Sequence, residues 1–147
     1  TRKTTPLLRS LEKYAVRVGG GLNHRHGLFD MIMLKENHIR AAGGITRAVS
    51  KIQMQNASYK VEVEVSNLDE LAEAVAVKAD RVMLDNMSLK DIKAAVKRFG
   101  KKVELEISGG VNEDNILQYA KTGVHYISSG ALTHSYKSLD ISLLFKE

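Results

Sequence analysis

The strongest constraint on the fold is a strict alternation of apolar and charged side chains in two short segments. Successive side chains of a β-strand point to opposite faces of its sheet. Each segment is therefore predicted to be a strand with one apolar face and one polar face. In residues 60–65 the apolar positions are Val61, Val63 and Val65 against Glu62 and Glu64; in residues 103–108 they are Val103, Leu105 and Ile107 against Glu104, Glu106 and Ser108.

Strand-like and helix-like segments follow one another along most of the chain. This order predicts repeated βα units and a parallel sheet. The predicted strands are residues 31–35, 60–65, 81–85, 102–108 and, more weakly, 125–129. The predicted helices are residues 7–18, 44–56, 68–75, 89–99 and 112–121.

The two unequal strand faces favour a barrel over a doubly wound sheet. Helices cover both faces of a doubly wound sheet, so its strands are apolar on both sides. A barrel packs helices on its outer face alone and turns the other face to a shared lumen. We therefore predict an α/β fold, an incomplete, open parallel α/β barrel of about six strands, similar to a TIM barrel, whose first strand precedes residue 1.

The composition indicates a globular domain that binds small anions. The 147 residues are 44% hydrophobic and 27% charged, with a formal net charge of +5. The lysines and arginines are scattered, which favours a phosphorylated metabolite over nucleic acid. No apolar run approaches the roughly 20 residues that span a bilayer, so no membrane segment is expected. The absence of cysteine excludes disulfides and thiolate chemistry but does not by itself identify a compartment. A cytoplasmic location is expected.

Polar residues end several of the predicted strands. In parallel α/β barrels the active site lies at the C-terminal ends of the strands. Lys35, Glu64, Asp85 and Ser108 occupy these positions and are predicted to share one site. Glu62 and Glu104 lie deeper on the same faces, where pairing with cations in the lumen is an alternative to a functional role.

Loops of the chain combine cations with glycines. Arg2, Lys3, His24, Arg25 and Lys35 fall in three loops that would converge above the barrel. Arginine binds carboxylates in a bidentate manner, so such a set fits a dicarboxylate, although surface ion pairs are the alternative. Glycine turns after the last strands allow backbone N–H groups to approach a phosphate. These turns are Ser108-Gly109-Gly110 and Ser129-Gly130-Ala131.

The combined motifs resemble those of quinolinate phosphoribosyltransferase, the decarboxylating enzyme of NAD biosynthesis. The resemblance spans nearly the whole chain. The motifs that carry it are Thr1-Arg2-Lys3-Thr4-Thr5-Pro6, Gly19-Gly20-Gly21-Leu22-Asn23-His24-Arg25, Lys35-Glu36-Asn37-His38, Ser129-Gly130-Ala131-Leu132-Thr133-His134-Ser135 and Leu139-Asp140-Ile141-Ser142-Leu143. Leu7 departs from the pattern, because glycine is expected after the proline.

The resemblance implies a role for each candidate residue. Catalysis would involve Lys3, Lys35, Glu64 and Asp85. Quinolinate would be bound by Arg2, His24, Arg25 and Lys35. The donor, 5-phosphoribosyl-1-pyrophosphate, would be bound by Lys3, Glu64, Asp85, Ser108, Gly109, Gly110, Ser129, Gly130 and His134. Glu64 and Asp85 would also face the donor's Mg²⁺, and the residues alone do not divide the two roles between them.

The resemblance also implies a larger assembly. An N-terminal domain and the first barrel strand would precede residues 1–147, which form the barrel domain. A homodimer or higher homo-oligomer is expected, in which the partner's N-terminal domain completes the site. Two alternatives remain open: a related transferase that uses nicotinate or another acceptor, and a non-catalytic barrel that binds a phosphorylated sugar.

Overall fold

Five parallel strands form one sheet in the order in which they occur along the chain. The computed structural model describes residues 3–55 and 58–146. The strands are β1 (Ile32–Leu34), β2 (Val61–Val65), β3 (Arg81–Asp85), β4 (Glu104–Ser108) and β5 (Tyr126–Ile127). The predicted α/β class is confirmed, and the order never reverses, as in successive strands of a barrel. The additional first strand stays a prediction.

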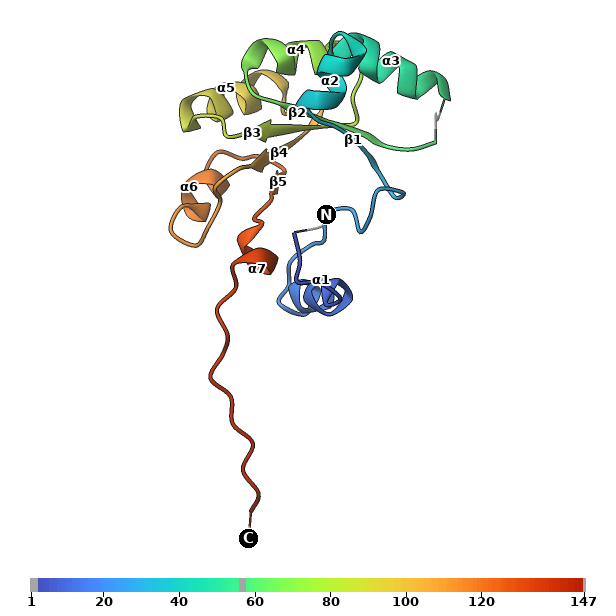
Figure 1. Cartoon of the computed structure of the whole chain (residues 1–147). Coiled ribbons are helices and arrows are strands. Elements are labelled where there is room, and N and C mark those ends of the chain that lie inside the picture. Colours follow the sequence, from blue (N-terminus) through green and yellow to red (C-terminus); the bar gives the residue numbers. More distant parts are fainter. Residues whose placement is uncertain (1–2, 56–57, 147) are drawn as a thin grey trace.

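Seven helices accompany the described strands. They are α1 (Arg9–Val18), α2 (Glu36–Ala42), α3 (Ile45–Gln55), α4 (Leu68–Ala76), α5 (Leu89–Phe99), α6 (Ile116–Ala120) and α7 (Ala131–His134). Helices α2 to α5 cover one face of the sheet, whereas α1 and α7 lie beyond the opposite face (Figure 1). Residues 136–146 form neither helix nor strand and extend away from the body of the molecule (Figure 1).

The apolar strand faces form the core beneath the covering helices. Val63 of β2 pairs in register with Leu34 on one side and with Val82 on the other. Val82 in turn pairs with Leu105, which is fully buried. Helices α3, α4 and α5 add further buried apolar residues, namely Ile45, Ala48, Val49, Leu71, Ala74, Ile92, Ala95 and Phe99. The predicted division of the strands into an apolar face and a polar face is confirmed.

Local side-chain chemistry fixes the starts of two covering helices. The Asn67 side chain accepts hydrogen bonds from the first-turn N–H groups of Asp69 and Glu70, and the Ser88 hydroxyl accepts one from Asp91. Such caps satisfy N–H groups that have no partner within the helix. They set the point at which the chain leaves the C-terminal end of each strand.

Several predicted helices and strands are shorter in the structure than the sequence indicated. The strand predicted over 102–108 begins at Glu104, the one over 125–129 is two residues long, and the helix over 112–121 contracts to α6. The first helix begins at Arg9 because Leu7 has a φ of 66°, a left-handed conformation that favours glycine. Helix α2 was not predicted.

Candidate active site

A cleft of about 1300 Å³ lies at the C-terminal ends of the strands. It brings together residues from the first loop, α1, the loop before β1 and the loops after the strands. The predicted site residues that line it are Lys3, His24, Arg25, Lys35, Glu64, Asp85, Ser108, Gly109, Gly110, Ser129, Gly130 and His134. The other predicted residue, Arg2, lies outside the described residues.

Lys35 and Glu64 form an ion pair at one side of this cleft. Their Nζ and Oε2 atoms are 2.5 Å apart. Lys35 immediately precedes α2, and Glu64 lies near the end of the adjacent strand β2. The Lys35 side chain is about half exposed, so the pair adds little to stability and remains accessible to a ligand.

Asp85 ends β3, and the following residue supports its carboxylate. Asn86 has a φ of 52°, and its side-chain Nδ2 donates to Asp85 Oδ2 at 2.9 Å. The Asn86 N–H also donates to the Ser108 carbonyl at 3.0 Å. The sequence analysis missed Asn86, although asparagine directly after a strand is a known signal for a left-handed turn.

Gly109 allows the loop after β4 to pass close to Asn86. Its φ is 95°, and a Cβ at this position would collide with the Asn86 side chain. Glycine is therefore required here by backbone conformation and by space. The two strand-end loops are fitted to each other, which places Asp85 and Ser108 side by side in register.

The loop that contains His24 and Arg25 is fastened to α1. Asn23 Nδ2 donates to the Lys13 carbonyl at 2.9 Å, and Lys13 Nζ donates to the Arg25 carbonyl at 3.1 Å. Burial lowers the pKa of Lys13, while the charge of Asp30 opposes this shift. The Arg25 guanidinium donates to the Met31 carbonyl at 3.1 Å, which holds it at the cleft wall.

Charged side chains fill the polar face of the sheet below the cleft. Arg81 lies 2.9 Å from Glu104 and 3.3 Å from Glu106. Arg81 also stacks on the Tyr126 ring, 4.0 Å from its centre. The predicted pairing of Glu104 with a lumen cation is confirmed, whereas the partner of Glu62 is His24, 2.9 Å away.

Two carboxylates of this face, those of Glu106 and Glu104, have shifted pKa values. Burial, and then the nearby charge of Glu62, raises the pKa of Glu106, against the opposing effects of Ser128, His24 and Arg81. The hydrogen bond from Arg81 lowers the pKa of Glu104. Ser128 Oγ donates to Glu106 Oε1 at 2.5 Å, a contact that the sequence analysis did not predict.

At the far end of the cleft the first loop contacts α7. Thr133 Oγ1 donates to the Lys3 carbonyl at 2.7 Å. A Cβ on Gly130 would lie 2.8 Å from His134 Nε2, so glycine leaves room for this ring. Ser129 Oγ donates to the Val111 carbonyl at 2.7 Å. Lys3, Gly130 and His134 are thereby gathered beside the loop of Gly109 and Gly110.

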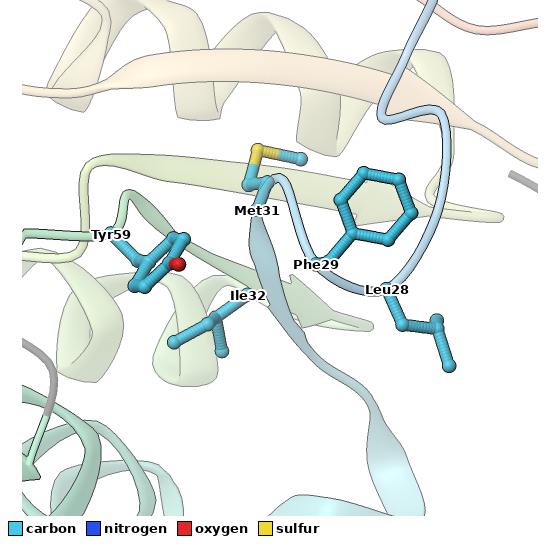
Figure 2. A pocket seen from close by; sticks show the side chains of 5 residues that line it. All are labelled: Leu28, Phe29, Met31, Ile32 and Tyr59. Atoms are coloured by element: carbon cyan, nitrogen blue, oxygen red, sulfur yellow. The ribbon is translucent and has the colours of Figure 1, made fainter.

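A second hollow of about 200 Å³ lies beside β1 and has an apolar lining. Figure 2 shows its side chains, Leu28, Phe29, Met31, Ile32 and Tyr59. It contains none of the predicted site residues. Three histidines, His26, His38 and His125, are likewise outside the cleft lining among the described residues.

Comparison with known proteins assigns the family. The model of the quinolinate phosphoribosyl transferase C-terminal domain matches residues 1–144. The chain belongs to this family. This membership agrees with the resemblance inferred from the loop motifs.

Individual members of the quinolinate phosphoribosyltransferase family are highly similar to the chain. A probable nicotinate-nucleotide pyrophosphorylase (carboxylating) of Methanocaldococcus jannaschii is 51% identical, over 97% of this chain and 53% of the relative. A Bacillus subtilis relative with the same description is 49% identical, over 97% of this chain and 50% of its own length.

A solved structure shows the same relationship in three dimensions. The nicotinate-nucleotide pyrophosphorylase of Francisella tularensis superposes with a TM-score of 0.93 at 56% identity, over 97% of this chain and 51% of that one. The chain therefore spans about half the length of the relatives that it matches. No helix in the described part of the chain is long and apolar enough to cross a membrane.

Proposed function

We propose that this chain is the barrel part of a longer enzyme that transfers a phosphoribosyl group from 5-phosphoribosyl-1-pyrophosphate to quinolinate. The products would be nicotinate mononucleotide, pyrophosphate and CO2. Family membership supports the reaction. The observation that carries the proposal is one cleft in which Lys3, Arg25 and Lys35 line the same space as Glu64 and Asp85.

The acceptor would bind on the cationic side of the cleft. Arg25 and Lys35 supply positive charge from adjacent loops, Arg2 is predicted to join them, and His24 lines the same cleft. Two carboxylates on one pyridine ring match several cations better than one carboxylate would. This charge match favours quinolinate over nicotinate and would orient the ring nitrogen toward the anomeric carbon of the donor.

The donor would lie between the carboxylates and the glycine loops. Glu64 and Asp85 are placed to face the ribose, while the loops of Gly109, Gly110 and Gly130 leave room for phosphate oxygens. Mg²⁺ is often held in proteins by one or two carboxylates together with substrate phosphates. Glu64 and Asp85 fit that donor set, and the ion would supply positive charge beside the pyrophosphate.

The transfer step would form a bond between the quinolinate nitrogen and the anomeric carbon as the bond to pyrophosphate breaks. Positive charge would develop on the ribose, and the carboxylates of Glu64 and Asp85 would stabilise it. The bond to the 2-carboxylate would then break and release CO2. Its electron pair would remain on the ring carbon, stabilised by the pyridinium, and a proton delivered near Lys3 or Lys35 would complete the product.

The complete site would form in a homodimer or higher homo-oligomer, with the partner's N-terminal domain closing the cleft. The relatives' length leaves room for such a domain, since about half of each lies beyond the matched region. A cytoplasmic location is part of the same proposal. Size-exclusion chromatography with light scattering, and cell fractionation, test these two points.

Product analysis of the full-length enzyme tests the reaction. The enzyme is mixed with Mg²⁺, the phosphoribosyl donor and either quinolinate or nicotinate, and nicotinate mononucleotide is measured by chromatography. We expect product from quinolinate alone. Product from nicotinate alone would favour the related transferase, and donor binding without pyrophosphate release would favour the phosphosugar-binding barrel.

A further inference from the structure

His24 connects the acceptor loop to two buried carboxylates on the sheet. Its Nε2 lies 2.9 Å from Glu62 Oε2 and 3.5 Å from Glu106 Oε1. Glu62 and Glu106 are 0% and 1% exposed and come from strands β2 and β4. The three side chains therefore join a loop to the floor of the cleft.

The hydrogen on the His24 ring can be placed from its neighbours. The Arg25 N–H donates to His24 Nδ1 at 2.9 Å. A ring nitrogen that accepts a hydrogen bond carries no hydrogen of its own, so the ring hydrogen is on Nε2. It faces the two glutamates, and an Nε2 that carries hydrogen does not ligate a cation.

Glu62 depends on this contact. Its two carboxylate oxygens and His24 Nε2 are buried, and within residues 3–55 and 58–146 none of the three makes a hydrogen bond of good geometry, so the 2.9 Å approach of Nε2 to Oε2 is the close polar contact of this carboxylate. A buried carboxylate without a partner is unfavourable, so Glu62 strongly favours a donor such as the His24 ring. Glu106, by contrast, is also supported by Arg81 and Ser128.

We propose that Glu62, assisted by Glu106, is a positioning residue that holds His24 and thereby places Arg25 for the acceptor, without touching the acceptor itself. The inference rests on the proposed function, because it assigns the acceptor to the Arg25 loop. The opposite side of this loop is already held by Lys13 and Asn23. The contact with Glu62 fixes the side that faces the sheet.

Steady-state kinetics of the full-length enzyme tests the positioning role. Glu62→Leu removes the carboxylate that lies 2.9 Å from Nε2 and is expected to raise KM for quinolinate about tenfold, which corresponds to about 1.4 kcal/mol. KM for the phosphoribosyl donor and kcat are expected to stay close to the parental values. Glu62→Gln keeps an oxygen acceptor and is expected to recover most of the affinity for quinolinate.

Glu104→Leu is the matched control, because it removes a carboxylate from the same sheet face without contacting His24. It is expected to leave KM for quinolinate unchanged. Equal losses toward both substrates in Glu62→Leu, or no recovery in Glu62→Gln, would overturn the proposal.

A spectroscopic measurement on the parental enzyme does not depend on the variants or on turnover. With ¹⁵N-labelled histidine rings, NMR is expected to show hydrogen on His24 Nε2 and none on Nδ1. The opposite tautomer would overturn the positioning role even in an active enzyme. If the proposed function were wrong, the parental enzyme would instead make no product from quinolinate.

Discussion

Gly109→Ala offers a sharp test of how the strand-end loops are fitted together. The φ of 95° at this position is unfavourable for a residue with a Cβ, at a cost of about 1 to 2 kcal/mol. The new methyl group would also displace Asn86 and disrupt its hydrogen bond to Asp85, which contributes about 0.5 to 1.5 kcal/mol. Together these effects predict a loss of about 1.5 to 3.5 kcal/mol in the free energy of unfolding.

Gly123→Ala separates the cost of the backbone conformation from the cost of displacing Asn86. Gly123 also has a positive φ, 79°, but an added Cβ would meet only Val96 Cγ1 at 3.9 Å, an ordinary contact. This variant should lose about 1 to 2 kcal/mol from the backbone alone. It should leave donor binding unchanged, because Gly123 is not part of the cleft lining among the described residues.

Urea unfolding and donor kinetics of the two full-length variants test whether Asn86 supports Asp85. Gly109→Ala should be the less stable and should raise KM for the phosphoribosyl donor, because Asp85 loses its support. Equal unfolding free energies together with equal donor KM values would refute the reasoning about Asn86.

Three further predictions follow from the same geometry. Arg25→Ala should raise KM for quinolinate at least about tenfold with a smaller effect on donor KM, because charged hydrogen bonds contribute about 1.5 to 3 kcal/mol; parental kinetics would contradict its assignment. Asp85→Ala should raise KM for the phosphoribosyl donor with a smaller effect on KM for quinolinate, as measured by pyrophosphate release at fixed quinolinate. Arg81 lowers the pKa of Glu104, so this carboxylate stabilises the fold above its unfolded pKa and loses that contribution as pH falls through the lower folded value. Glu104→Gln should therefore flatten the acid side of the stability profile in pH-dependent unfolding, and an unchanged profile would count against the Arg81 contact.

The strand faces could be predicted because their information is local. In β2 the alternation of valine and glutamate already separates the core face from the cleft face, and the structure places Val63 and Glu62 accordingly. Cleft residues were predictable for a related reason, since the end of each strand fixes the position of Lys35, Glu64 and Asp85 along the barrel axis.

Contacts between distant segments could not be predicted in the same way. The pairing of His24 with Glu62 and Glu106 depends on how a loop folds over two strands, and no spacing along the chain encodes it. Helix α2 was missed because it is only seven residues long, and its cap uses Lys35 and His38 in place of a common capping residue. Short elements that depend on tertiary contacts leave weak periodic signals.

The most direct test of the central claim is the stoichiometry of decarboxylation. Full-length enzyme with Mg²⁺ and phosphoribosyl donor is given quinolinate labelled in its 2-carboxylate, and labelled CO2 is measured beside nicotinate mononucleotide. The account predicts equal amounts of the two, and loss of both in Asp85→Ala. Nucleotide without labelled CO2, or labelled CO2 without nucleotide, would contradict it.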